Sequence, residues 1–302
     1  MITHSSKLKF SDMSIKRKIV TSYRPSDERG FLGPDHTARA VVQVPYPDSD
    51  PFILLMDDML DKKDTTPVGG EHPHAGFETV SLLLKGEMGD KRHKMKGGDL
   101  QIMTAGSGII HTETMDKIAS MRWLQLWLNL PKKDRWAAPR VQDLSFESAP
   151  VISRNGVTVR LYSGSLEGVS SPVKNYAPLI LADIQAEADS SITLNIPANY
   201  TTFMYVLEGN IKVGEEDTPL DQGQVGWLDR FTDEAQSELK LTTATSSSRM
   251  ILYSGKPQDE PITSHGPFIA DTNEDIMRLY KEYRQGEMKH ISTIEEAQVL
   301  QW

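Results

Sequence analysis

The feature that most constrains the fold is the strict alternation of apolar and polar or aromatic side chains across residues 122–130. Period-two alternation over this many residues predicts a β-strand, because successive side chains of a strand point to opposite faces. One face carries only leucines, and the other carries tryptophan, glutamine and asparagine: Leu124, Leu126, Leu128 and Leu130 against Trp123, Gln125, Trp127 and Asn129. We expect the leucine face in a core, whereas the opposite face could line a pocket or pack on a second domain.

Other short apolar runs, each bounded by glycine or proline, indicate that most of the chain is β-structure. Many short strands separated by such turns are typical of an all-β barrel or sandwich. Polar residues 57–58 and 61–64, which follow one of these runs, are expected to form a solvated loop. The runs that read as strands are residues 38–44, 52–56, 77–84 and 100–103.

Only the C-terminal region has the periodicity of a helix, over residues 273–285. Thr272 is a candidate N-cap, acidic residues occupy the first turn, and Gly286 follows the end. Apolar residues recur three and four positions apart, which predicts a docking face rather than a cofactor site. That stripe is Ile276, Leu279, Tyr280 and Tyr283.

The chain is long enough for two domains, and a proline-rich break at 131–139 is the best boundary between them. Residues 199–210 can be aligned with residues 76–87, so the second half repeats the first in outline. We therefore predict two related antiparallel β-barrels, with domains at residues 1–135 and 136–302 and the helix in the second.

Charge and cysteine content exclude several classes of function. The net charge of −9 argues against direct binding to nucleic acid and against docking on anionic lipid. With no cysteine, a thiolate nucleophile or an iron–sulfur cluster is impossible. The first residues lack the apolar core of a signal peptide and no run is long enough to span a membrane, so we expect a cytoplasmic protein.

Two short pairs of residues carry the candidate chemistry. His72 and His74 are two positions apart, as are His111 and Glu113, so each pair presents two side chains on one face of a strand. If the two strands are neighbours, three imidazoles and one carboxylate converge on a point. This donor set suits a divalent first-row metal ion and leaves coordination positions open for a substrate.

The remaining acidic and imidazole groups of this region are interpreted differently. His93 is expected to be a surface histidine rather than a ligand. Glu78 lies four residues after His74, on the same face if the strand is regular, so it could be a ligand or could hydrogen-bond to one. In the second half, Asn195 and Pro197 occupy the positions that match the first two histidines, so that barrel is expected to bind no metal.

Several longer motifs resemble the pirin family, a branch of the cupins. The similarity runs from about residue 40 to about residue 285, and the combination is more specific than any one motif. The motifs are HPHAGFETV at 72–80, GDLQIMTAGSGIIHTE at 98–113, LQLWLNL at 124–130 and HGPFIADTNEDI at 265–276.

The resemblance implies a bicupin, with a metal held in the N-terminal barrel by His72, His74, His111 and Glu113. The family's usual metal is iron, and Zn, Ni, Cu, Mn or Co are alternatives. Some bacterial pirins resemble quercetin 2,3-dioxygenase, which implies a flavonol-like aromatic substrate and dioxygen. Animal pirins are instead regulators, which implies the alternative of a redox- or metal-sensing protein that binds a protein partner without catalysis.

In the enzyme hypothesis, Glu113 is the catalytic base that accepts the proton of the substrate hydroxyl. A third hypothesis is that the metal is purely structural and closed off from solvent. The family's usual arginine and tryptophan are replaced by Ala75 and Ile102, and the segment 88–97 is shorter than usual; all three departures could lie near the pocket mouth and alter the substrate. Apolar residues expected to line that mouth are Phe77, Leu82, Met103, Ile110 and Trp127.

Overall fold

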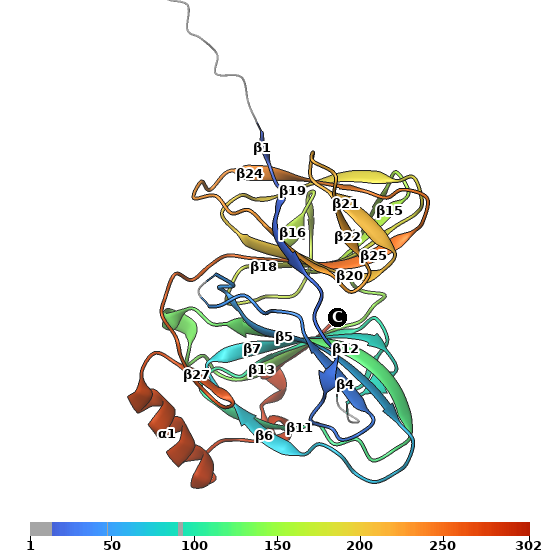
Figure 1. Cartoon of the computed structure of the whole chain (residues 1–302). Coiled ribbons are helices and arrows are strands. Elements are labelled where there is room, and N and C mark those ends of the chain that lie inside the picture. Colours follow the sequence, from blue (N-terminus) through green and yellow to red (C-terminus); the bar gives the residue numbers. More distant parts are fainter. Residues whose placement is uncertain (1–13, 47, 90–92) are drawn as a thin grey trace, which may run out of the picture.

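The computed structural model describes residues 14–46, 48–89 and 93–302, and it is built almost entirely from strands. Two barrel-like bodies lie one above the other, with the N-terminal body below and the C-terminal body above in the orientation of Figure 1. The predicted all-β fold with two antiparallel barrels and a C-terminal helix is thereby confirmed.

An eight-stranded sheet forms the inner wall of the N-terminal barrel, next to its neighbour. All its pairings are antiparallel except the one at the edge between β13 and β28. In spatial order it contains β28 (Val299–Gln301), β13 (Arg140–Leu144), β10 (Leu100–Thr104), β7 (Phe77–Lys85), β12 (Ala119–Asn129), β5 (Phe52–Lys62), β4 (His36–Ala40) and β3 (Glu28–Arg29).

The C-terminal barrel consists of a seven-stranded sheet facing this wall and a five-stranded sheet behind it. The seven strands, in order, are β14 (Val151–Arg154), β15 (Val157–Ser163), β18 (Leu179–Ala186), β25 (Ser248–Gly255), β20 (Thr201–Glu208), β23 (Val225–Leu228) and β2 (Ile19–Tyr23). The five are β1 (Ile15–Lys16), β24 (Gln236–Thr242), β21 (Asn210–Val213), β22 (Thr218–Asp221) and β19 (Ser191–Pro197).

Four two-stranded ribbons and short helices complete the described chain. The ribbon β6–β11 carries the predicted ligands, and α1 has the predicted cap, since the Thr272 side chain accepts a hydrogen bond from the backbone of Asp275. The ribbons are β6 (Glu71–His74) with β11 (Ile109–Thr112), β8 (Glu87–Met88) with β9 (Met95–Lys96), β16 (Ser165–Leu166) with β17 (Val169–Ser170), and β26 (Thr263–His265) with β27 (Phe268–Ala270). The helices are α1 (Asn273–Arg284), η1 (Lys132–Asp134), η2 (Ile291–Thr293) and η3 (Glu296–Gln298).

The two large sheets follow the same strand order, which is the structural basis of the weak repeat in the sequence. The series β13-β10-β7-β12-β5-β4-β3 of the first matches β2-β23-β20-β25-β18-β15-β14 of the second. Each sheet takes one edge strand from the other half of the chain. β2, from the start of the chain, belongs to the C-terminal sheet, whereas β13, which follows the proposed boundary at residue 135, belongs to the N-terminal sheet. The domain boundary at residue 135 stays a prediction, and the sheets cross it at these two strands.

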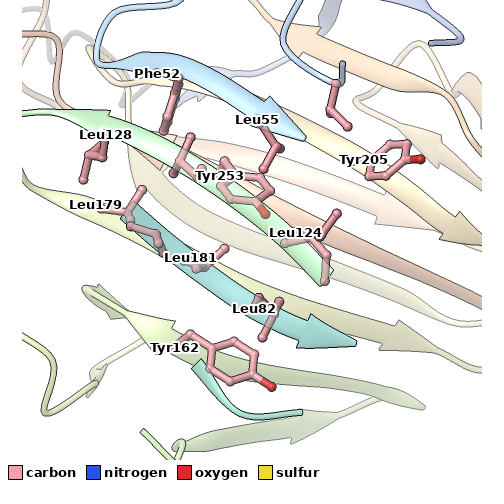
Figure 2. Close-up of a cluster of buried hydrophobic side chains, with 14 of the residues drawn as sticks. Phe52, Leu55, Leu82, Leu124, Leu128, Tyr162, Leu179, Leu181, Tyr205 and Tyr253 are labelled. Atoms are coloured by element: carbon pink, nitrogen blue, oxygen red, sulfur yellow. The ribbon is translucent and has the colours of Figure 1, made fainter. Parts of the chain in front are cut away.

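The largest apolar cluster lies between the two barrels and contains the leucine face of β12. Leu124, Leu126 and Leu128 are fully buried there against the aromatic residues Phe203 and Tyr253 of the second sheet. Figure 2 shows Leu124 and Leu128 among side chains from both halves, including Tyr253. The predicted core is therefore an interface, which holds the two barrels together.

Two predictions about exposure are wrong. Asp57 and Asp58 are not in a solvated loop, because β5 continues through them to Lys62 and both are buried. Asp57 accepts two hydrogen bonds from Arg122 and one from Tyr205 of the other barrel, which offset the cost of burying its charge. His93 is also buried, and its Nδ1 lies 2.9 Å from a carboxylate oxygen of Asp143. Residues 90–92, just before His93, lie outside the described residues.

The chain returns to the N-terminal barrel after β25, so its last segment packs on the metal-ligand candidates. Figure 1 shows α1 and β27 beside β6, and β28 joins the edge of the first sheet. Phe268 forms a β-bridge with Ala75, and His290 forms one with Ile110. In the part of the chain described, every helix is too short or too polar to cross a membrane.

Candidate metal centre

The ribbon β6–β11 brings the two predicted ligand pairs together. Its register places His72 directly opposite His111, and directly opposite residues of an antiparallel pair project to the same side. His74 projects to that side as well, because it is two residues from His72. Glu113 follows immediately after β11 and continues the alternation, so the strand geometry expected from the sequence is observed.

Three imidazoles meet at short distances. Nitrogen atoms of His72, His74 and His111 all lie within 4.8 Å of one another. The carboxylate of Glu113 lies 3.9 Å from Nε2 of His72 and 4.0 Å from Nε2 of His111. Ligands on opposite sides of one ion are separated by about 4.2 Å, because each metal–ligand bond is about 2.1 Å long.

The hydrogen bond of His72 fixes which of its nitrogens faces the site. Its Nδ1 lies 3.1 Å from the carbonyl oxygen of Gly70, and since a carbonyl only accepts, Nδ1 carries the proton. The lone pair is therefore on Nε2, which is 2.7 Å from Nε2 of His111. Two imidazole nitrogens this close need either a proton or a cation between them, so the arrangement fits a metal ion.

Burial keeps the imidazoles in the neutral form that binds metals. Burial lowers the pKa of His111 to about 4, although the nearby Glu113 opposes the shift. Burial, reinforced by the imidazoles of His111 and His72, lowers the pKa of His74 well below its usual value, and the backbone at Pro267 opposes this only weakly. At neutral pH both rings present lone pairs rather than positive charge.

Glu113 is held in place by its neighbours in the fold. Nε2 of Gln125, on the polar face of β12, donates a hydrogen bond of 3.1 Å to Oε1 of Glu113. The backbone carbonyl of Glu113 lies against Gly69, whose φ is +79° and where a Cβ atom would come within 2.0 Å of that oxygen. Only glycine fits this close approach, which explains the glycine before the ligand strand.

A large cavity of about 800 Å³ opens beside the site. Its polar lining includes His72, His74, Glu113 and Gln125, together with the charged residues Glu28, Arg29, Asp58 and Glu71. Apolar side chains line the rest, and a pocket of this volume that combines apolar walls with polar groups is typical of a binding site for an organic molecule. The apolar lining residues are Phe31, Ala38, Leu54, Met56, Trp127 and Pro267.

The outcome for the predicted lining residues is mixed. Trp127 lines the cavity, and Phe77 supports it from behind by stacking on its ring at 4.3 Å. Leu82, Met103 and Ile110 do not line it, because each faces an apolar cluster elsewhere in the core. The substituted positions Ala75 and Ile102 are likewise fully buried away from the cavity.

Glu78 does not face the site. Its carboxylate accepts hydrogen bonds from Thr104 and Asn175, and Arg140 is 3.7 Å away. The prediction assumed one regular strand from His74 onward, whereas Gly76, with φ +86°, separates β6 from β7 and breaks the alternation. Burial raises the pKa of Glu78, as expected for a carboxylate inside the interface between the barrels.

A second acidic group of the cavity wall was missed in the sequence. Asp58 lines the cavity and accepts a hydrogen bond of 2.9 Å from Nε2 of His36, whose Nδ1 accepts one from the backbone of Leu32. Burial raises the pKa of Asp58, against the effect of His36. The alternation of β5 would have identified it only if the strand had been extended past Met56.

The comparisons with known proteins agree with this geometry. The family model described as Pirin matches residues 36–128, and the one described as Pirin C-terminal cupin domain matches residues 181–289. Mouse Pirin is 32% identical over 282 residues, covering 90% of this chain and 94% of its own length. A Pseudomonas aeruginosa protein described as a candidate quercetin 2,3-dioxygenase is 33% identical, covering 78% and 85% of the two chains.

The fold has a close counterpart among crystal structures. A quercetin 2,3-dioxygenase from Acinetobacter baumannii superposes with a TM-score of 0.78 at 26% identity, covering 91% of this chain and 98% of that one. Both halves of the chain match the family, and the three clustered histidines could hold a metal ion. The chain belongs to the pirin family of cupin proteins.

Proposed function

We propose that the protein is a metal-dependent dioxygenase that cleaves a flavonol such as quercetin. The observation that carries the proposal is the cluster of four candidate ligands, His72, His74, His111 and Glu113, three of which (His72, His74 and Glu113) line a cavity large enough for an aromatic molecule. The bound metal is expected to be Fe(II), and other divalent ions suit the same donor set. The names of the bacterial relatives support the substrate class.

The residues around the cavity suit the steps that flavonol oxidation requires. When bound, the metal would act as a Lewis acid that favours the ionised form of the substrate hydroxyl. Glu113 is placed to accept the hydroxyl proton, and Gln125 orients it through the hydrogen bond to Oε1. The indole of Trp127 offers a flat face against which an aromatic ring can stack.

The cavity also explains how a reactive, electron-rich anion would be protected. Trp127 and Leu54 lie opposite each other in the pairing of β12 with β5, so they form a continuous apolar wall. Pro267, from the returning C-terminal segment, closes the end near His74. An apolar wall excludes water and strengthens the electrostatic interactions inside the site.

Turnover of quercetin tests the proposal. Protein loaded with Fe(II) is mixed with quercetin and oxygen, and the loss of flavonol absorbance is followed; we expect turnover that disappears in His74→Ala together with the metal. Asn195→Ala in the second barrel is the matched control and should keep full activity. Absence of turnover in fully metal-loaded protein would refute the enzyme and favour a metal-sensing interaction protein.

A further inference from the structure

A second cavity, of about 280 Å³, lies on the other side of the candidate ligands. Its lining includes His111 but neither His72 nor His74, which line the large cavity instead. Glu113 and Gln125 line both cavities. The metal-site residues therefore form a wall between two separate spaces.

The two cavities differ in size and in chemistry. The large one falls within the range of about 300–1,000 Å³ that holds drug-sized organic ligands, whereas the small one falls just below that range. The small cavity also has a mixed lining, with hydroxyl and amide groups beside methionine side chains. They include Thr79, Ser81 and Gln101 on the large sheet, together with Met95 and Met115.

The small cavity has its own opening to the surface. Thr112 and Thr114, which flank Glu113, are exposed and line it, as does His290 from the C-terminal segment. The hydroxyl of Thr112 lies 3.0 Å from Nε2 of His290, so the segment forms one side of the mouth. A molecule could thus reach His111 and Glu113 without passing through the large cavity.

We infer that the small cavity is a separate entrance for a molecule of the size of dioxygen. A flat aromatic substrate that fills the large cavity and contacts Glu113 would block that route to the metal. A second approach from the His111 side lets the small reactant arrive after the substrate is in place. The inference rests on the proposed metal site, but it does not depend on catalytic turnover.

Blocking each cavity separately tests the inference. Ser81 lies directly between Gln125 and Gln101 in the sheet register, so Ser81→Leu places a larger side chain in the small cavity. Leu54→Trp is the matched variant for the large cavity. Both are measured anaerobically as Fe(II)-loaded proteins, with quercetin as the aromatic probe and with nitric oxide as a diatomic probe that is added after quercetin has filled the large cavity.

We expect Ser81→Leu to slow formation of the iron nitrosyl absorbance by about tenfold or more, with quercetin affinity changed by less than about twofold. Leu54→Trp should lower the quercetin affinity but leave the rate of nitrosyl formation nearly unchanged. Equal iron content and unfolding temperature show that the variants are folded, and Thr79→Leu replaces Ser81→Leu if that variant does not fold.

An unchanged nitrosyl rate in the small-cavity variant, or a slowed rate in Leu54→Trp, would overturn the inference, because the diatomic would then enter through the large cavity. Failure of the proposed function looks different. If the protein does not bind quercetin at all, the tryptophan side chain of Leu54→Trp narrows the large cavity in its place, and the nitric oxide rate of that variant still decides whether the second entrance exists.

Discussion

The two barrels share a strand order but differ in what fills them. In the N-terminal barrel, the ribbon β6–β11 points imidazoles into an open space beside two cavities. In the C-terminal barrel, β19 and β24 are paired in the same antiparallel way, but their inward side chains are aliphatic. These are Ile192, Leu194 and Ile196 on β19 and Leu239 and Leu241 on β24, all buried in one cluster.

The comparison teaches that the same strand order can hold either converging imidazoles or an aliphatic interior, and that the type of side chain on two strands makes the difference. Asn195, aligned in sequence with a ligand, is exposed and points away from the aliphatic interior. The closed apolar barrel contributes stability through burial, whereas the open barrel keeps polar groups in a cavity at some cost in stability. The candidate metal centre is thus supported by a neighbouring barrel whose interior is aliphatic.

The largest effect is expected from removing a ligand in the open barrel. His74→Ala should lower metal affinity by more than about 100-fold, because even outer-shell partners of ligands are worth about 10–100-fold. Metal content after dialysis measures the effect, and circular dichroism shows whether the strands persist. Asn195→Ala should leave both quantities unchanged; an equal loss of metal in that variant would contradict the division of roles.

A substitution inside the closed barrel is expected to lower stability without affecting metal binding. Leu194 is fully buried in its aliphatic cluster, so Leu194→Ala should lower the free energy of unfolding by about 2–5 kcal/mol. Metal bound per folded chain should stay the same, since the ligands are in the other barrel. Urea denaturation and metal analysis on the same sample test both statements, and a loss of metal from folded chains would disprove the second.

Local periodicity was sufficient to predict the parts of the molecule that depend on neighbouring residues. The alternation in β12 predicted a buried leucine face, and the spacing of His72, His74, His111 and Glu113 predicted a common face. Both predictions rest on the two-residue repeat of a strand, which is set by backbone geometry alone.

Features that depend on contacts between distant segments could not be predicted from local sequence patterns. Phe31 and Pro267 reach the large cavity from opposite ends of the chain, and no local pattern places them together. Asp57 is buried because Arg122 and Tyr205 surround it, partners that only the folded sheets reveal. The error at Glu78 had a local cause, since Gly76 signalled a break that the assumption of a regular strand ignored.

In the metal-free protein, the first barrel is expected to contribute a smaller, pH-dependent change in the free energy of unfolding that the second barrel lacks. No histidine occurs between residues 112 and 264, whereas the His111 side chain is only 12% exposed and its partial burial lowers its pKa from 6.5 to about 4. Between pH 4 and pH 6.5 the unfolded chain binds more protons than the folded one, so the free energy of unfolding falls as the pH is lowered. The expected slope is about 1.4 kcal/mol per pH unit for one proton, and it vanishes below the folded pKa.

Denaturation in the presence of a chelator, at several values between pH 4 and pH 7, measures this slope. The variant His111→Asn lacks the titrating group and should show a shallower dependence than the unmodified protein. Carboxylates that titrate in the same range are common to both proteins and cancel in the difference. Identical slopes would mean that His111 is not held neutral by burial.

The smallest effect is expected from the residue that positions the carboxylate ligand. Gln125→Leu removes the hydrogen bond to Oε1 of Glu113 but keeps the size of the side chain, so metal affinity should fall by about 10–100-fold and recover at higher metal concentration. Gln101→Leu is the matched control, because Gln101 also lines the small cavity but donates to Asp143 instead. Titration with a competing chelator measures both affinities. If the two variants lose the same affinity, the effect comes from the polarity of the cavity and not from the orientation of Glu113, and the open barrel then needs its polar lining as much as it needs its ligands.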